Sequence, residues 1–270
     1  MKIGIIGLGK LGSCLAEVLA EHYEVMGVDR YAKGIKNITT STSFSILKGC
    51  KVVFNVVNTP SLSNGDFNNE YLFESINQAK PYLNCKVFVV VSTVMPGTCE
   101  EVSKMLDCKI CYNPEFIRLD SIIEDMKNPD FVLIGEEDKK SGKILERIYK
   151  KFTDAPMKHM SCKSAEFAKI VLNSYITMKI TFANTIGLIS KQIGTDAEKI
   201  LDAVGQDHRI GTSYFKSGGA YGGPCFPRDN IAFSNIAKGI LNYAKVTDKI
   251  NKKVAKEFGA FSDDERYQNV

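Results

Sequence analysis

Short apolar runs alternate with amphipathic segments through the N-terminal half of the chain. The apolar run at 3–7 is followed by apolar positions at helical spacing over 10–21 and by a second apolar run at 24–28. This order predicts a strand, a helix and a strand joined as a βαβ unit with a right-handed crossover. We expect further strands at 51–57, 86–91, 109–112 and 131–135, and further helices at 69–80, 98–107 and 138–151.

The expected strands are nearly continuous in apolar residues, as in the run Lys-Val-Val-Phe-Asn-Val-Val at 51–57. Such runs are typical of parallel strands that are covered on both faces. Strands and helices that alternate with short connections therefore predict an α/β fold, with a Rossmann-type doubly wound sheet in the N-terminal part.

The pattern changes near residue 160. Between Ser164 and Ile193 there is no proline and only one glycine, and an apolar stripe follows helical spacing. A helix of this length would measure about 45 Å at 1.5 Å per residue, so we expect a strut between domains or a dimer interface. The prediction is a Rossmann domain at 1–160 and an all-helical domain at 161–270 built on this long central helix.

Local signals predict how the helical part continues. Gly194 ends the long helix, and Thr195 and Glu198 form a capping box that starts the next one. After a glycine-rich segment at 211–223, helices are expected at about 229–239 and 243–258.

Composition places the chain among ordinary globular proteins, with 44% hydrophobic and 24% charged residues. The net charge of +4 includes no block of Lys and Arg that would indicate nucleic-acid binding. No run reaches the roughly 18 apolar residues that span a bilayer, and the start leads into a strand rather than a signal peptide. We therefore expect a cytoplasmic protein with no nucleic-acid and no membrane partner.

The eight cysteines are scattered, which in a reducing compartment predicts small buried hydrophobes. Cys108 and Cys111 have CxxC spacing, but they lie in a strand-like run with no second CxxC and no nearby histidine. We therefore expect neither zinc binding nor a redox role for this motif. The three histidines are far apart in sequence, and no metal site is expected.

A glycine pattern marks the turn between the first strand and the first helix. Gly7, Gly9 and Gly12 form GxGxxG, whose glycines permit a tight turn, approach of a pyrophosphate and close helix packing. Asp29, at the end of the next strand, would bond ribose hydroxyls and repel a 2′-phosphate, which favours NAD over NADP, although Arg30 lies beside it. The alternative is a turn that merely needs glycine. The expected NAD contacts here are Gly7, Leu8, Gly9, Lys10, Leu11, Gly12, Asp29 and Arg30.

One cysteine stands between glycines and a predicted helix start, in Tyr221-Gly-Gly-Pro-Cys225-Phe-Pro-Arg228-Asp229. A helix N-terminus lowers the pKa of a thiol and favours the nucleophilic thiolate. Asp229, four residues on, could hold a water molecule or the thiol. The alternative is a buried structural cysteine in a glycine turn.

The segment around Cys225 resembles the GGxCFPKD catalytic-cysteine motif of the UDP-glucose/GDP-mannose dehydrogenase family. Other segments resemble motifs of the same family in the same order along the chain. They are Asn58-Thr-Pro60, Ser92-Thr-Val94 with Pro96-Gly-Thr98, Asn113-Pro-Glu115-Phe-Ile-Arg118, Glu166 with Lys169 and Asn173, and Asp207-His-Arg209-Ile-Gly211. The resemblance covers nearly all of residues 1–258.

The resemblance implies a four-electron oxidation of a nucleotide sugar at C6, with NAD as the hydride acceptor. Cys225 would capture the intermediate aldehyde as a thiohemiacetal, which a second oxidation turns into a thioester that water cleaves to the uronate. Lys169 and Asn173 match the residues that stabilise the developing oxyanion. Glu115 matches the general base of hydrolysis, and Asp229 matches an acid that orients the water.

The same resemblance implies further contacts. Thr93 matches a residue that holds the catalytic water. Expected substrate contacts are Glu115, Phe116, Lys169, Asn173, Arg209, Tyr221, Gly222 and Gly223. Further expected cofactor contacts are Thr59, Ser92, Thr93 and Arg228. Plainer alternatives are solvated helix positions for Lys169 and Asn173, a helix-start acid for Glu115, and a strand-end hydroxyl for Thr93.

Three positions depart from the family motifs. Arg228 stands where the motif has lysine. The planar guanidinium keeps the positive charge of the lysine ammonium but donates hydrogen bonds in a different geometry, so its contacts differ. Leu119 takes the place of an acid, with Asp120 as the nearest substitute, and Phe131 replaces an arginine.

Members of this family carry a third, C-terminal Rossmann-like domain that helps to bind the nucleotide, whereas this sequence stops after the helices that follow Cys225. A truncated enzyme, a natural short form with another substrate, and a two-chain enzyme whose partner supplies the domain all stay open. Because remote binding energy supports chemistry at the reacting carbon, we expect residues 1–270 alone to bind a nucleotide sugar weakly. The family also implies a homodimer through the helix at 164–193, with Arg209 reaching across.

Two other functions compete with the nucleotide-sugar dehydrogenase. One is a two-electron NAD-dependent hydroxyacid dehydrogenase, which shares a Rossmann domain and a long-helix domain with a Lys and an Asn four residues on. Such enzymes use no catalytic cysteine, so Cys225 separates the two. The other is a non-catalytic remnant that binds NAD or dimerises.

Overall fold

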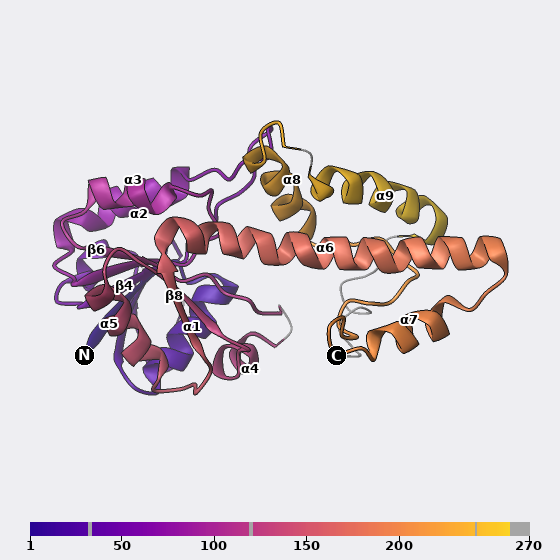
Figure 1. The fold of residues 1–270 in the computed structure, drawn as a ribbon. Coiled ribbons are helices and arrows are strands. Elements are labelled where there is room, and N and C mark those ends of the chain that lie inside the picture. Colours follow the sequence, from indigo (N-terminus) through magenta and orange to yellow (C-terminus); the bar gives the residue numbers. More distant parts are fainter. Residues whose placement is uncertain (32–33, 119–120, 241, 260–270) are drawn as a thin grey trace. The chain divides into compact units, whose positions relative to one another are not determined.

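The computed structural model describes residues 1–31, 34–118, 121–240 and 242–259. The chain forms two compact units (Figure 1). The first unit comprises Met1–Leu62 and Phe67–Lys169, and the second comprises Ser63–Asp66 and the chain from Ile170 onward.

The first unit is built around one eight-stranded sheet in the order β3-β2-β1-β4-β5-β6-β7-β8. Its strands are β1 (Lys2–Ile6), β2 (Glu24–Val28), β3 (Thr39–Ser41), β4 (Val52–Asn55), β5 (Val87–Val90), β6 (Lys109–Tyr112), β7 (Val132–Glu136) and β8 (Met157–Ser161). All neighbours pair in parallel except β6 and β7, which run antiparallel. The strand order reverses at β1 and β4, as in a doubly wound sheet, so the α/β prediction is confirmed.

Helices cover both faces of this sheet (Figure 1). They are α1 (Lys10–Ala20), α2 (Glu70–Ala79), α3 (Thr98–Met105), α4 (Ile122–Lys127) and α5 (Lys139–Tyr149), with short 3-10 helices η1 (Phe44–Leu47) and η2 (Lys80–Tyr82). Strand residues alternate between two apolar cores: Val87 and Val89 pack in the core of α1, α4 and α5, whereas Phe88 and Val90 pack in the core of α2 and α3. Burial on both faces explains why the strands read as continuous apolar runs.

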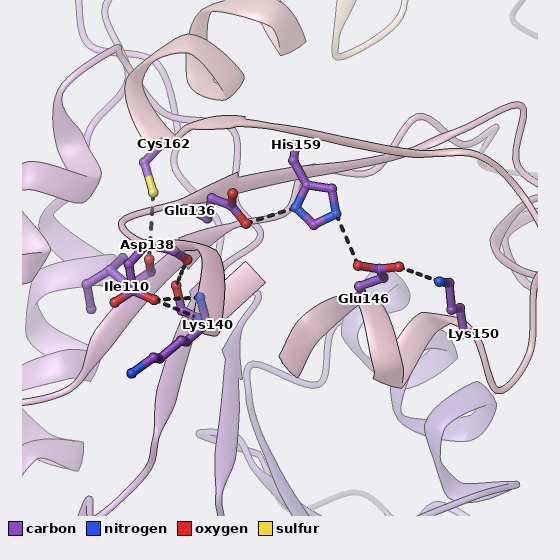
Figure 2. Close-up of polar contacts among 9 residues, drawn as sticks. Ile110, Glu136, Asp138, Lys140, Glu146, Lys150, His159 and Cys162 are labelled. Atoms are coloured by element: carbon purple, nitrogen blue, oxygen red, sulfur yellow. Dashed lines mark hydrogen bonds and ion pairs between the residues drawn. The ribbon is translucent and has the colours of Figure 1, made fainter. Parts of the chain in front are cut away.

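Two edge strands were not predicted. β3 is only three residues long, and β8 is polar, with Lys158, His159 and Ser161 exposed. Figure 2 shows that His159 lies between two carboxylates, with its Nδ1 2.8 Å from Glu136 and its Nε2 3.5 Å from Glu146. Because ladder hydrogen bonds and contacts between polar side chains hold β8, hydrophobic periodicity gives no signal for it.

The second unit is helical. It contains most of α6 (Cys162–Ile193) together with α7 (Ala197–Gly205), α8 (Phe226–Ile236) and α9 (Tyr243–Phe258). The 32 residues of α6 span about 48 Å, and the division between the units falls within this helix, after Lys169. Gly194, with a φ of +74°, follows its last residue as predicted. None of the helices in the described ranges combines the length and the apolar character that a membrane span needs.

Two local predictions were wrong. The N-cap of α7 is Asp196, whose carboxylate accepts from Lys199 N at 3.2 Å, so the capping box from Thr195 does not form. An aspartate competes well for this position because its side chain reaches the free N–H groups. Helix α8 begins at Phe226, three residues before the predicted start, which places Cys225 directly at its N-terminus.

Candidate cofactor and catalytic site

The glycine turn after β1 is constrained by backbone packing at two of its three glycines. Gly7 has a φ of +90°, and a Cβ there would lie 3.1 Å from the backbone of Val56. A Cβ on Gly12 would lie 1.9 Å from the carbonyl oxygen of Gly7. At Gly9, by contrast, a Cβ would meet nothing within 4 Å, and the backbone is in the extended region. Internal packing therefore does not explain Gly9, whereas close approach of a ligand does.

The turn presents a helix N-terminus to that open side. Gly9 is the N-cap of α1, and no side chain in the described residues caps the helix, so backbone N–H groups of its first turn, from Lys10, Leu11 and Gly12, can bind phosphate. Asp29, which follows β2, accepts from Leu8 N at 2.7 Å and from Tyr31 N at 2.9 Å. These bonds fix the carboxylate beside the turn.

The side chain of Arg30, next to Asp29, contacts residues of α2. Its guanidinium lies 2.6 Å from Glu74 and 5.1 Å from the ring centroid of Tyr71. Because the charge of Arg30 is paired with Glu74, a 2′-phosphate would meet the negative charge of Asp29 first. This arrangement favours NAD over NADP.

Hydroxyl groups tie together the loops that follow β4 and β5. Thr59 Oγ1 donates to the carbonyl oxygen of Thr93 at 2.6 Å, and Ser92 Oγ donates to that of Val57. Thr59 and Ser92 are buried, whereas Thr93 is half-buried. Carboxyl ends of parallel strands share one edge of a sheet, so these loops lie at the same edge as the glycine turn.

Glu115 and Lys169 meet in the first unit. Lys169 Nζ donates to the carbonyl oxygen of Glu115 at 2.8 Å and lies 4.8 Å from the ring centroid of Phe116. Tyr149 donates its hydroxyl to the Glu115 carboxylate at 3.3 Å. A cavity of about 20 Å³, which is room for one water molecule, is lined by Glu115, Phe116 and Tyr149 among others. Burial raises the pKa of Glu115 to about 7, against the lowering effects of Tyr149 and of the Lys169 charge.

A carboxyl with a pKa near 7 is suited to exchange a proton with a water molecule at neutral pH. The apolar wall of this cavity includes Phe131, whose ring centroid lies 5.0 Å from that of Phe116. Phe131 therefore supplies packing where the family motif has an arginine. Leu119 and Asp120 lie outside the described residues.

Cys225 stands in the second unit as an exposed cysteine, outside any disulfide, directly before α8. Asp229 follows one turn later and is 1% exposed. Its Oδ2 accepts from Asn173 Nδ2 at 2.6 Å, while its Oδ1 has no hydrogen-bond partner among the described residues and lies 3.5 Å from Arg228 Nε. Residues four apart share a helix face, so a buried acceptor oxygen lies on the side of α8 that carries Cys225.

The glycine-rich segment before Cys225 is held by a residue that sequence reasoning missed. The amide of Asn184 on α6 donates to Gly219 O at 2.7 Å and accepts from Gly218 N and Gly219 N at 3.0 and 3.2 Å. An asparagine inside a helix gives no sequence signal of this role, because its partners lie 34 and 35 residues away.

Tyr221 is 3% exposed and faces the helical core of the second unit. Its hydroxyl donates to Asp248, and its backbone N and O bond the side chain of Asn251 at 2.8 and 2.9 Å. Gly222 is half-buried, and Gly223 is exposed in the loop that leads to Cys225. The contacts of Tyr221 in this chain are therefore structural.

Arg209 lies on the surface with 77% of its side chain exposed. Its guanidinium forms a two-point pair with Asp207, at 3.0 Å from Nε and 2.6 Å from Nη2. Lys179 of α6 caps the same turn by donating to the carbonyl oxygens of Ile210 and Gly211. The turn thus holds Arg209 outward, away from the body of its own unit.

Glu166 has a structural role that the motif does not reveal. Its side chain is fully buried and accepts from Gly97 N at 2.6 Å and Cys99 N at 2.7 Å, which caps the N-terminus of α3. Within the described ranges, no group of three or more His, Cys, Asp or Glu side chains could hold a metal ion.

Two domain profiles match this chain. The NAD-binding domain of the UDP-glucose/GDP-mannose dehydrogenase family matches residues 32–153, and the central domain of the same family matches residues 163–253. The chain belongs to this family. The family match and the open glycine turn identify NAD as the cofactor of its N-terminal domain.

Individual relatives agree with this assignment. The chain is 33% identical over 212 residues to a UDP-glucose 6-dehydrogenase of Rickettsia bellii, which covers 76% of this chain and 49% of the relative. It is 32% identical over 295 residues to a GDP-mannose 6-dehydrogenase of Pseudomonas putida. This match covers 93% of this chain and 67% of the relative. The structure of a UDP-glucose dehydrogenase from Pyrobaculum islandicum superposes with a TM-score of 0.82 at 28% identity, covering 95% of this chain and 68% of the other.

The chain spans about half the length of the UDP-glucose 6-dehydrogenases that it matches. Its similarity to family members lies in the NAD-binding and central domains.

Proposed function

We propose that this chain carries the chemistry of an NAD-dependent nucleotide-sugar 6-dehydrogenase, which oxidises a C6 alcohol to a carboxylate in two steps. The observation that carries the proposal is the exposed thiol of Cys225 at the N-terminus of α8, with the buried Asp229 one turn later. A two-electron hydroxyacid dehydrogenase has no use for such a thiol.

When bound, NAD supplies the hydride acceptor. In the proposal, the amides of the α1 N-terminus hold its pyrophosphate, and Asp29 holds its ribose hydroxyls. The open side of Gly9 allows this approach, and the guanidinium of Arg30 is paired with Glu74 rather than with a site for a 2′-phosphate.

The protein side chains then divide the chemistry. The thiolate of Cys225 adds to the aldehyde carbon and forms the thiohemiacetal, which becomes a thioester when its carbon gives up a second hydride to the acceptor. Water then attacks the thioester carbon, the C–S bond breaks, and the carboxylate and the Cys225 thiolate are released. Glu115, with a pKa near 7, accepts the proton of that water. Lys169 supplies positive charge for the oxyanion, and Asn173 orients Asp229 through their hydrogen bond.

The test is NADH formation by the purified chain with a panel of UDP- and GDP-hexoses, counting NADH per sugar consumed. We expect two NADH per sugar for the wild type and a loss of at least about a thousandfold in rate for Cys225→Ala, because covalent capture is removed. Cys14→Ala serves as a matched control, since Cys14 is a half-buried cysteine to which no role in the chemistry is assigned.

Other outcomes point to the competing functions. Full turnover by Cys225→Ala with one NADH per substrate would favour the hydroxyacid dehydrogenase. NAD binding without any reduction would favour the non-catalytic remnant, or a chain that needs a partner domain to bind the nucleotide. Tight binding of a UDP-sugar by this chain alone would contradict the expected need for such a domain.

We also propose that the exposed apolar side of α6 in the second unit forms a homodimer interface. Tyr175, Phe182, Ile189 and Ile193 are each at least 44% exposed there. Clustered exposed apolar side chains of this kind mark interaction surfaces. Arg209, held outward by Asp207, would then contact the partner or its substrate.

A further inference from the structure

Two thiols touch where the chain enters neighbouring strands of the sheet. Cys85 lies two residues before β5 and Cys108 lies one residue before β6, and their sulfur atoms are 3.4 Å apart. The backbone around them is paired, since Val87 lies opposite Lys109 and Lys109 N donates to Lys86 O at 3.3 Å. Continued by one residue, this register puts Cys108 opposite Lys86, so that Cys85 is offset from Cys108 by one position. A strand spacing of about 4.8 Å and a rise of about 3.3 Å per residue place the two Cα atoms roughly 6 Å apart, which is within the range that a disulfide spans.

The two thiols differ in exposure and acidity. Cys85 is buried, whereas Cys108 is half-buried and so reachable from solvent. The hydrogen bond from Cys85 lowers the pKa of the Cys108 thiol, and this effect exceeds the raising effects of burial, Glu137 and Asp107. The same bond raises the pKa of Cys85. Cys108 is therefore the better nucleophile of the pair.

Cys111, the other member of the CxxC motif, is unsuited to pair with Cys108. It is fully buried in the core of α1, α4 and α5, while Cys108 packs against the core of α2 and α3. Burial raises the pKa of Cys111 to about 12. The partner that matters for Cys108 thus comes from the preceding strand and not from its own.

We propose that Cys85 and Cys108 form a redox pair that closes to an intramolecular disulfide in the presence of a small-molecule disulfide. The Cys108 thiolate attacks one sulfur of R–S–S–R, forms a mixed disulfide and releases one thiolate. Cys85 loses its proton to solvent and attacks the Cys108 sulfur, which releases the second thiolate. Two protein thiols are oxidised to one disulfide, and one reagent disulfide is reduced to two thiols.

Closure would change the stability of the first unit. The disulfide would join positions 23 residues apart and enclose α3 together with the loop that carries Ser92 and Thr93. A cross-link over such a loop restricts the unfolded chain, so we expect the melting temperature of the oxidised form to rise by about 5–10 °C.

The experiment uses the full chain and oxidised glutathione as the probe. After the reaction, free thiols are blocked with N-ethylmaleimide, and non-reduced tryptic peptides are mapped by mass spectrometry. Cleavage after Lys86 and Lys109 places Cys85, Cys108 and Cys111 on three different peptides. We expect the Cys85 and Cys108 peptides to be joined, and dithiothreitol to separate them. Alkylation of both cysteines, or a link from Cys108 to Cys111, would overturn the proposal.

Single cysteine substitutions test which of the two thiols reacts first. Cys85→Ser should trap one glutathione on Cys108, because the resolving thiol is gone. Cys108→Ser should leave Cys85 unmodified, and Cys111→Ser should still form the link. The exposed Cys225 reports that the reagent was active in every variant. Glutathione on Cys85 in the Cys108→Ser variant would contradict the assigned order of attack.

Discussion

Glu115 is a residue whose surroundings change its chemistry. In the folded chain its pKa is about 7, against 4.5 for an ordinary glutamate, and the largest cause is burial. Between these two pH values the folded chain holds a proton that the unfolded chain has released. The free energy of unfolding therefore falls as the pH rises from about 4.5 to about 7, and the cost is fully present above pH 7.

Glu115→Gln should remove this dependence, because an amide stays neutral at every pH. Between pH 4.5 and pH 8 the wild type should lose up to about 3 kcal/mol more than the variant in the free energy of unfolding. Urea titrations followed by circular dichroism at both pH values measure the difference. The exposed Glu101→Gln is the matched control and should follow the wild type. If the free energy of unfolding changed equally with pH in the wild type and in Glu115→Gln, the carboxyl of Glu115 would not be desolvated.

For single residues, the sequence indicated which side chains belong to the candidate site better than it indicated which atoms they contact. Cys225, Lys169 and Glu115 stand out through motif resemblance, and Lys169 does contact Glu115. The roles of Glu166 and Asn184 depend on backbone atoms at least 34 positions away. Such partners become visible only once the chain is folded, since no local pattern encodes them.

Among the elements, α3 depends on a cap from another helix. Its N-terminal amides at Gly97 and Cys99 donate to Glu166, which lies on α6 within the first unit. Glu166→Ala would leave two N–H groups without this acceptor, at a cost of about 2–4 kcal/mol in the free energy of unfolding. Glu100→Ala is the matched control, because Glu100 is exposed and its ion pair with Lys163 is 3.6 Å long.

Urea unfolding of both variants tests this prediction. The control should change stability by less than about 1 kcal/mol. If the free energy of unfolding fell equally in Glu166→Ala and Glu100→Ala, the buried carboxylate of Glu166 would not stabilise α3. Glu166→Gln should fall between them, since its amide keeps one acceptor oxygen.

The elements that the sequence predicted are those that bury apolar side chains. β1, β4 and β5 appear as apolar runs because helices cover both of their faces. β8 does not, since its residues are largely exposed. The start of α7 was misplaced by one residue because Thr195 and Asp196 are both good caps, and only the fold decides between them.

For the whole molecule, the proposed assembly of two copies can be tested on α6. Tyr175 is 59% exposed on this helix, and Tyr243, at 74%, offers a matched tyrosine at the start of α9. Tyr175→Asp should shift the molecular mass measured by light scattering from dimer to monomer, because a charge would be buried in an apolar interface. Tyr243→Asp should remain a dimer. A wild type that is monomeric at all concentrations would refute the interface.

The polar character of β8 has a consequence for how copies can meet. β8 ends the sheet, and an edge strand with free backbone groups is a template on which another chain could add a strand. Here the exposed Lys158 puts a charge at that edge. His159 lies there between the carboxylates of Glu136 and Glu146 (Figure 2). A second copy that docked there would have to strip water from these groups. The polar side chains of β8 therefore oppose the addition of a strand from another copy at this edge of the sheet.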